Sequence, residues 1–536
     1  MQRSFKDAMD WLHTWAGIIL GAVMFVIFFM GTLSVFADET DQWFWPSVRH
    51  VETQQPVSLD RLLDTALEVS GRHPEVIGLV KPTERMPAAQ ILVQPKEGRT
   101  WIYFVDPETY EILAPLDSGS ASQFFYPMHY RLHIPGGRWI VGATSMFLLL
   151  GLFSGIIIHK KIFVDFFTFR KGKKLPRVSL DLHNLTSVLA MPFHLAITIT
   201  GILIFASLYL ERSAEALYPE DDSPRSAVRA DTYGGYSREL SGETNLRISS
   251  VDAMATRAAQ HMNGQPIRGA YLRNPHDEDG IAYISSVSKD YVSVGTNTVT
   301  FDPDSGAVLN TPSMSAAGKA QDFIVGMHEI HFDHLLLRWL YVIGGLAGCV
   351  MIATGFIYWI ESRRVKHARG EKNGVPVVEG LTIWAVMGLL TATAAYFVAN
   401  QALPRGTWQF WGIERVFWEV IVFYVVWLLA IPHGAFRKRN AWFDQSVLLA
   451  VLCCAAVLLN WGVTGDNLLR TIWIGQWSVA IMDMVLLLTA VTAGYAALRL
   501  KVNWRTEVEY RNERAAKQAL RAAANTPTKP PALAGE

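Results

Sequence analysis

Apolar and polar stretches alternate along this chain on the length scale of a lipid bilayer. A helix needs about 20 mainly apolar residues to cross roughly 30 Å of hydrocarbon, and most of the apolar stretches approach that length. They fall at residues 15–36, 139–158, 185–210, 335–360, 381–398, 417–431, 447–459 and 472–498. The pattern predicts a mainly α-helical membrane protein with about eight transmembrane helices.

The same pattern sets the expected domain boundaries. We expect a first transmembrane helix in 1–38, an insertion at 39–122, a second helix in 123–160, a basic loop at 161–180, a third helix in 181–210, a second insertion at 211–321, a fourth helix in 322–362, a loop at 363–378, four further helices in 379–500 and a tail at 501–536. The tail is polar and rich in Ala and Pro after Ala523, which predicts partial disorder.

The charge distribution predicts which loops are cytoplasmic, and charge and cysteine content limit the kinds of site that the chain could carry. Lys and Arg crowd the 161–180 and 363–378 connections, so the positive-inside rule places both loops and both termini in the cytoplasm and both insertions outside it. The formal net charge of +0 lacks the basic excess of a nucleic-acid binder. The three cysteines lie within expected spans without ligand-like spacing, which argues against a disulfide framework or a thiolate metal site.

The two insertions resemble each other in the order of their predicted elements. Each begins with Ser-x-Asp, at residues 58–60 and 250–252, and continues into a helical pattern. Strand-like runs follow at 90–93 and 100–104 in the first insertion, and at 282–284 and 298–301 in the second. In each insertion the second run is followed by Asp-Pro, at residues 106–107 and 302–303. The insertions therefore read as two related α+β modules.

The flanking helices repeat as well. His13 lies 18 residues before Gly31, and His183 lies 18 residues before Gly201. At about 1.5 Å per residue this spacing is roughly 27 Å, close to one membrane core. His133 and His331 similarly precede Gly155 and Gly355 in the second and fourth spans. The first 360 or so residues therefore read as two copies of a helix, module, helix unit.

These repeated segments resemble the PepSY-associated transmembrane family, which includes proteins described as iron-regulated membrane proteins. The resemblance is carried by residues 12–17 (LHTWAG), 132–137 (LHIPGG), 181–184 (DLHN), 199–201 (ITG) and the helix from His331 to Trp359. It implies two extracytoplasmic PepSY-like modules, a bacterial inner (cytoplasmic) membrane location and a part in iron acquisition. Some family members resemble haem-containing reductases of ferric siderophores, which implies haem b as the cofactor.

The chain has 15 histidines, and several lie at matched depths near the ends of the expected spans. A neutral imidazole is a good ligand for haem iron when its other ring nitrogen is hydrogen-bonded. We predict one haem between His13 and His183 on the cytoplasmic side, and a second between His133 and His331 on the other side. The reserve ligands that the sequence leaves open are His159, His194, His129 and His334.

Two further sets of polar residues could carry chemistry. His129, His328 and His334 cluster at the extracytoplasmic ends of spans and could receive substrate iron. Glu419 and Asp483 lie inside apolar runs, where an acid is a candidate for a quinone or proton site. The structural alternatives are neutralisation of Glu419 by Arg415 and hydrogen bonding of Asp483 to Asn460 or Gln476.

Neither a dinucleotide fingerprint nor a phosphate-binding loop is present in the sequence. The electron donor is therefore expected to be separate, either a quinol or a soluble reductase. The favoured function is a transmembrane haem b oxidoreductase that reduces a ferric siderophore or another ferric chelate and releases Fe(II), with membrane lipid around it. The alternatives are a non-enzymatic sensor or regulator and a metal permease.

Overall fold

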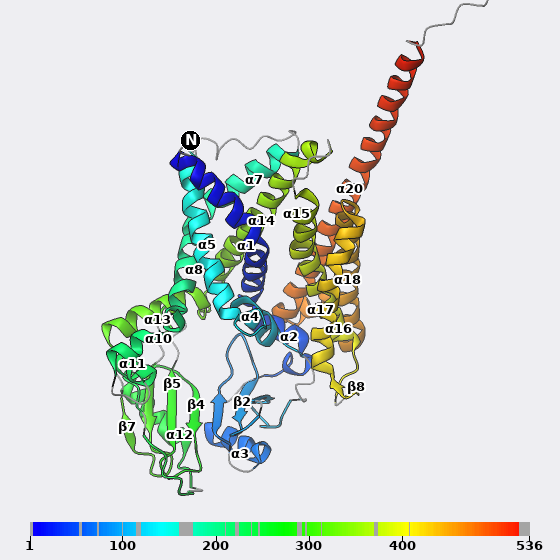
Figure 1. Cartoon of the computed structure of the whole chain (residues 1–536). Helices are drawn as coiled ribbons and strands as arrows, with labels where there is room; N and C mark the ends of the chain where they lie inside the picture. The colour runs from blue at the N-terminus through cyan, green and yellow to red at the C-terminus, as the bar shows by residue number, and fades with distance from the viewer. Residues whose placement is uncertain are drawn as a thin grey trace, which may run out of the picture.

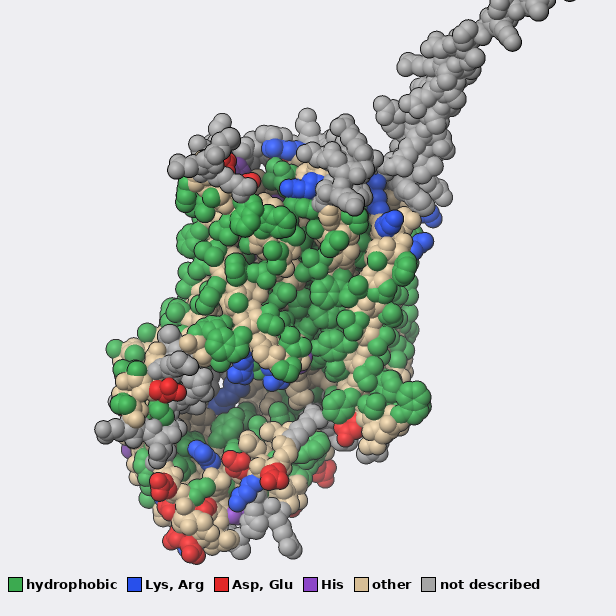
Figure 2. All heavy atoms as spheres, in the orientation of Figure 1, with side chains coloured by type: hydrophobic (Ala, Val, Ile, Leu, Met, Phe, Trp, Pro, Cys, Tyr) green, Lys and Arg blue, Asp and Glu red, His purple; other side chains and the backbone are tan. Residues whose placement is uncertain are grey.

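The computed structural model describes residues 4–52, 56–71, 74–98, 100–113, 119–159, 175–209, 211–219, 224–236, 238–244, 247–286, 292–294, 297–311, 314–368, 374–406 and 408–524. A bundle of long helices lies on one side of a single α+β layer (Figure 1). Hydrophobic side chains cover the visible sides of the bundle, and charged side chains gather at its ends and over the α+β layer (Figure 2). Most of the expected basic loop and the end of the tail lie outside the described residues.

Seven helices of the described chain are long and apolar enough to cross a membrane, or eight if one bent pair is a single span, which confirms the expected number. They include α1 (Phe5–Ser34), α5 (Gly137–Ile158), α14 (Leu335–Ala368), α15 (Val375–Thr382) with η2 (Ile383–Gly388) and α16 (Leu389–Ala402), α17 (Arg415–Arg437), α18 (Asn440–Thr464) and α20 (Trp477–Ala524). Helix α1 begins, and α20 ends, on the side of the bundle opposite the sheet (Figure 1).

The third expected span is broken in two. Helices α7 (Leu175–Leu189) and α8 (Met191–Ile204) meet at Ala190 with a bend of 66°. Pro192 stands in the first turn of α8. Proline has no backbone N–H and its ring clashes with the preceding turn, so it begins a helix readily and interrupts one that should continue.

The second and fourth expected spans each consist of two helices as well. Helix α4 (Ala121–Arg131) precedes α5, and α13 (Ala316–Glu329) precedes α14. Leu132 ends α4 with a φ of 53°, and Ile330 ends α13 with a φ of 55°, both in the left-handed region that stops a helix. The chain therefore turns between the histidines on either side of these two residues.

The two insertions together form one antiparallel sheet of seven strands in the order β3-β2-β1-β4-β5-β6-β7. The first insertion supplies α3 (Leu59–Ser70), β1 (Val76–Val80), β2 (Ala89–Gln94) and β3 (Trp101–Val105); the second supplies α12 (Val251–His261), β4 (Ile267–Arg273), β5 (Ile281–Ser286), β6 (Asn297–Phe301) and β7 (Val308–Asn310). The join is the pairing of β1 with β4, from Val76 opposite Arg273 to Val80 opposite Gly269.

Helices α3 and α12 share one hydrophobic core with this sheet. They also cap each other. Asp252 accepts a hydrogen bond from the backbone N–H of Leu59 at 2.9 Å, and Asp60 accepts one from the hydroxyl of Ser250 at 2.6 Å. Acidic groups are favourable at helix N-termini, so the matching Ser-x-Asp segments lock the two helices together.

Short elements connect these parts. They are α2 (Ala37–Phe44), η1 (Pro46–Val48), α9 (Ala206–Tyr209), α10 (Glu211–Leu217), α11 (Pro224–Tyr233), β8 (Gln409–Phe410), β9 (Ile413–Glu414) and α19 (Leu468–Trp473). Helix α20 runs on to Ala524, so the expected tail is helical as far as the structure describes it. The stretch 525–536, where disorder was predicted, lies outside the described residues.

Candidate functional site

Two histidine rings lie next to each other at the end of the bundle away from the sheet. The ring centroids of His13 on α1 and His183 on α7 lie 6.1 Å apart, with the ring planes at 81°. His13 Nδ1 donates a hydrogen bond to the carbonyl of Gly151 at 2.9 Å, and His183 Nδ1 donates one to the carbonyl of Met351 at 2.8 Å. The structure thus brings together the first histidine pair expected from the sequence.

A second pair of histidine rings lies at the end of the bundle near the sheet. The ring centroids of His129 on α4 and His328 on α13 are 6.0 Å apart, with the ring planes at 30°. His129 Nδ1 donates a hydrogen bond to the carbonyl of Ile27 at 2.8 Å. His328 Nδ1 lies 3.1 Å from the hydroxyl of Thr200. The sequence had marked both histidines, but as a reserve ligand and an iron-receiving residue.

All four rings occupy space left by a glycine on a neighbouring helix. A Cβ placed on Gly155 would lie 3.3 Å from His13, and one on Gly355 would lie 3.2 Å from His183. A Cβ on Gly31 would come within 2.7 Å of His129, and one on Gly201 within 2.8 Å of His328. These are the four glycines that mark the internal repeat, so the signal was present in the sequence.

The glycine contacts explain the orientation of the rings. Without a side chain on the glycine, each ring can reach a backbone acceptor on the helix beside it. The acceptors of His13 and His129 are the carbonyls four residues before Gly155 and Gly31, respectively. A hydrogen bond at Nδ1 holds the proton there and leaves Nε2 as the metal-binding atom.

Each histidine pair lines a cavity. The first cavity has a volume of about 680 Å³ and includes His13, His183 and His159 in its wall. The second has a volume of about 440 Å³ and includes His129 and His328. Both volumes fall within the usual range for small-molecule and cofactor sites. Met24 and Leu148 line both cavities, so single side chains separate them.

The second pair differs from the sequence prediction. His133 Nε2 lies 2.8 Å from the carbonyl of Phe124, and its ring stacks on the ring of that residue. His331 Nε2 lies 3.0 Å from the carbonyl of Ser293. The reason is the left-handed turn after α4 and after α13, which separates each of these histidines from the helix that faces the cavity. The structure therefore pairs His129 with His328 instead.

The remaining candidate histidines have separate environments. His159 Nε2 lies 3.0 Å from Asn184 Nδ2 at the first cavity. His194 is fully buried, with Nε2 3.2 Å from the carbonyl of Gly344. His334 Nδ1 accepts a hydrogen bond from the N–H of Leu337 at the start of α14. Among the described residues, no three His, Cys, Asp or Glu side chains could hold a metal ion. The iron-receiving cluster expected of His129, His328 and His334 therefore does not form.

The two intramembrane acids make specific contacts. Glu419 accepts a hydrogen bond from the backbone N–H of Gly119 at 2.7 Å and lies 3.4 Å from Arg415. Asp483 accepts a hydrogen bond from the indole N–H of Trp43 at 2.9 Å. Neither acid lines the two cavities described above. The neutralising partner expected for Glu419 is present. Asp483 is hydrogen-bonded to Asn460, as expected, and also to an indole that the sequence did not indicate.

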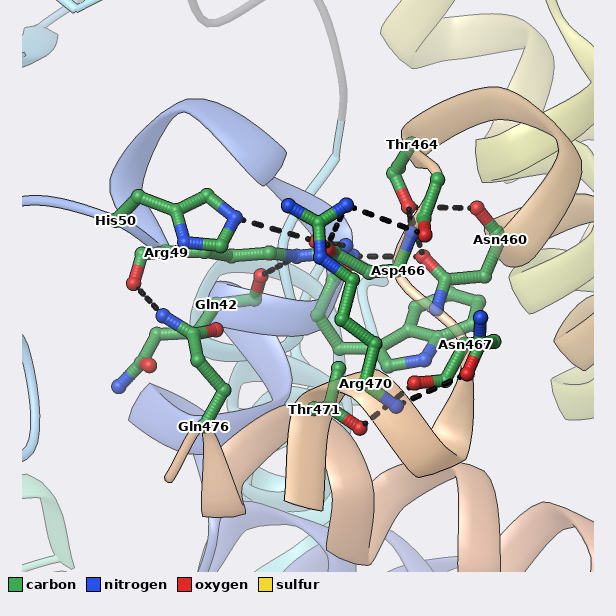
Figure 3. Close-up of polar contacts among 12 residues, drawn as sticks. Gln42, Arg49, His50, Asn460, Thr464, Asp466, Asn467, Arg470, Thr471 and Gln476 are labelled. Atoms are coloured by element: carbon green, nitrogen blue, oxygen red, sulfur yellow. Dashed lines mark hydrogen bonds and ion pairs between the residues drawn. The ribbon is translucent and has the colours of Figure 1, made fainter. Parts of the chain in front are cut away.

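A buried ion pair joins the first insertion to the C-terminal helices (Figure 3). Arg49 Nη1 lies 3.1 Å from Asp466 Oδ2, and Arg49 also donates to the side chain of Asn460 at 2.8 Å. His50 approaches the same carboxylate at 3.3 Å. Burial lowers the pKa of Arg49 to about 10, and the hydrogen bond to Asp466 opposes that shift. Arg49 therefore stays protonated at neutral pH.

Comparison with known proteins identifies the family. The family model described as the PepSY-associated TM region matches residues 11–362. The chain belongs to this family. The match spans α1 to α14 and includes both histidine pairs, whereas α17, α18 and α20 lie outside it. An uncharacterized protein of Pseudomonas aeruginosa is 22% identical over 283 residues, which cover 50% of this chain and 69% of that relative. The PepSY-associated region is thus the part that carries the candidate site.

Proposed function

We propose that this protein is a transmembrane haem b oxidoreductase that passes electrons from the cytoplasmic side of an inner membrane to a ferric chelate, such as a ferric siderophore, on the side of the insertions. The observation that carries the proposal is the spacing of the two histidine pairs, at 6.1 and 6.0 Å between ring centroids. The pairs use four separate helices, as cofactor sites in helical bundles do.

The spacing suits two imidazoles on opposite faces of one metal ion. Imidazole–metal bonds are about 2.0 Å long, which places the centroids of two opposed rings roughly 6 to 6.5 Å apart. Nδ1 of each ring is hydrogen-bonded to the neighbouring helix or to a hydroxyl on it, so each ring is held with Nε2 available. Each pair lines a cavity much larger than an ion, and the described residues offer no third His, Cys, Asp or Glu ligand, which favours haem over a bare ion.

Cationic side chains line both cavities and could pair with the carboxylates of a haem. Lys6 and Arg363 line the first cavity, and Arg138 lines the second. Guanidinium groups pair well with carboxylates. The bound haem would supply reversible one-electron chemistry. The protein's share is to hold the group, exclude water and bring the two cavities within one side chain of each other at Met24 and Leu148.

The wall of the second cavity includes a cationic side chain, Arg138, that could bind an anionic iron chelate. The guanidinium groups of Arg131 and Arg138 lie 5.7 and 5.4 Å from the ring centre of Tyr130. Tyr126, Tyr130 and Arg138 belong to the cavity wall. Hard oxygen ligands that suit Fe(III) hold Fe(II) less strongly, so one electron delivered here would loosen the metal. The donor on the opposite side would be a quinol or a soluble reductase.

The proposal is tested by the visible spectrum of the full-length protein purified from haem-replete cells. We expect a dithionite-reducible spectrum of bis-histidine haem. Replacing His13 or His183 with Ala should remove one haem, and replacing His129 or His328 should remove the other. His133→Ala and His331→Ala are the matched controls and should retain both. Colourless protein, or equal haem content in all six variants, would contradict the proposal and favour a sensor or regulator.

A further inference from the structure

Helix α4 carries His129 near its C-terminal end, and its N-terminal end is held by two buried acids from other elements. The backbone N–H of Ser122 donates to Asp41 of α2 at 3.3 Å, and the N–H of Gly119, just before the helix, donates to Glu419 of α17 at 2.7 Å. Asp41 is 2% exposed and Glu419 is 0% exposed. Both therefore satisfy donors that would otherwise be buried without a partner.

The same helix is packed along its length against the C-terminal bundle, by which we mean helices α15 to α20. The ring of Phe124 stacks on Tyr396 of α16 at 4.8 Å and meets Phe423 of α17 edge-on at 4.9 Å. The hydroxyl of Tyr424 lies 3.8 Å from the sulfur of Met128, the residue directly before His129. Helix α4 thus lies between the bundle on one side and α1, which receives the His129 hydrogen bond, on the other.

The charge of Glu419 is close enough to His129 to affect the reduction of a haem bound there. Gly119, whose N–H donates to Glu419, and His129 are ten positions apart, which is roughly 15 Å at 1.5 Å per residue. At that separation and an effective dielectric near 20, a unit charge changes a redox equilibrium by roughly sixfold. Arg415, 3.4 Å from Glu419, offsets part of that charge. A severalfold effect is therefore the expected scale.

We infer that Glu419 is a positioning residue for the haem ligand His129, and that through it the C-terminal bundle sets the redox poise of the extracytoplasmic haem site alone. The inference rests on the proposed function. It assigns to the last four spans, which lie outside the PepSY-associated region, the task of fixing α4 in place and of placing the carboxylate of Glu419 at its N-terminal end.

The test is a redox titration of the full-length, haem-loaded protein in which the two haems are followed separately by their low-spin electron paramagnetic resonance signals. In Glu419→Gln, we expect the haem at His129 and His328 to become severalfold easier to reduce at a fixed potential, because a negative charge is lost. The haem at His13 and His183 should not change. Glu419→Asp retains the charge and should restore most of the wild-type behaviour.

Two further variants keep the result decisive. Arg415→Gln combined with Glu419→Gln removes both charges, so it folds without a lone buried charge; because the two lost charges are opposite, the shift of the haem at His129 and His328 should be smaller than in Glu419→Gln. Asp483→Asn is the matched control, because this buried acid of the same bundle bonds to Trp43 and should leave both haems unchanged.

The outcomes separate the two proposals. A wild-type protein without haem overturns the proposed function and this inference with it. Haem-loaded protein in which Glu419→Gln shifts neither haem, or shifts both equally, overturns the inference alone. A shift of the same size in Asp483→Asn does so too, because it would show a general loosening of the bundle.

Discussion

The imidazole of His129 lies in the space that a side chain at position 31 would occupy, and a Cβ on Gly31 would come within 2.7 Å of His129 Nδ1. The contact joins α4 to α1 and places the ring beside the carbonyl of Ile27. The same arrangement of a histidine on a glycine recurs at all four rings, so the glycines determine where the ligands lie.

Gly31→Ala should therefore displace His129 and lower the occupancy of the second haem site. Overfilling a packed site of this kind costs about 1–3 kcal/mol, which is enough to move the ring out of position. The measurement is haem content per protein, expected to fall from about two towards one. Gly462→Ala in α18 is the control, because a Cβ there meets nothing within 4 Å. Full occupancy in Gly31→Ala would argue against the glycine contact as the determinant.

The two histidine pairs should give different spectroscopic signatures. The rings of His13 and His183 are nearly perpendicular at 81°, whereas those of His129 and His328 are at 30°. Ligand-plane orientation controls the anisotropy of low-spin ferric haem. We expect one strongly anisotropic signal and one rhombic signal in electron paramagnetic resonance, lost selectively in His13→Ala and His328→Ala, respectively. Two identical signals would contradict the ring geometry.

Asp41 should make stability depend on pH. Burial raises the pKa of Asp41 from 3.8 to about 8, despite the hydrogen bond from the Ser122 hydroxyl. The folded protein then keeps a proton that the unfolded chain loses, so this contribution is complete below about pH 4 and disappears as pH rises through 8. The expected slope is at most about 1.4 kcal/mol per pH unit.

The measurement is the melting temperature of detergent-solubilised protein between pH 5.5 and 9. Wild type should melt at lower temperature as pH rises. Asp41→Asn has no proton to lose and should show a flatter profile. Parallel profiles for the two proteins would mean that Asp41 does not titrate in this range.

The buried ion pair of Arg49 and Asp466 should contribute far more than an exposed one. Removing one partner leaves a buried charge alone, so Arg49→Ala should destabilise the protein by about 3–5 kcal/mol. Arg437→Ala is the control within the same bundle, since Arg437 pairs with Asp444 at 2.7 Å but its side chain is 53% exposed. The control should cost about 1 kcal/mol or less. Thermal unfolding of both variants makes the comparison, and equal losses would contradict it.

The sequence by itself predicted the membrane spans, the duplication and the family, and it placed the histidines near the ends of those spans. Hydrophobic runs report burial in lipid directly, and a count of residues along a helix gives height in the membrane. His13 and His183 could be paired in this way, because each lies 18 residues before a glycine of the same expected span, Gly31 and Gly201 respectively.

The tertiary structure alone decided which histidines meet on the other side. His129 and His133 are four residues apart, and an unbroken helix would present both on one face. The left-handed conformation of Leu132 ends α4 between them, as Ile330 ends α13 between His328 and His331. Apolar periodicity does not record a single backbone turn, nor the pairing of β1 with β4 that joins the two insertions, because both depend on contacts between segments far apart in the chain.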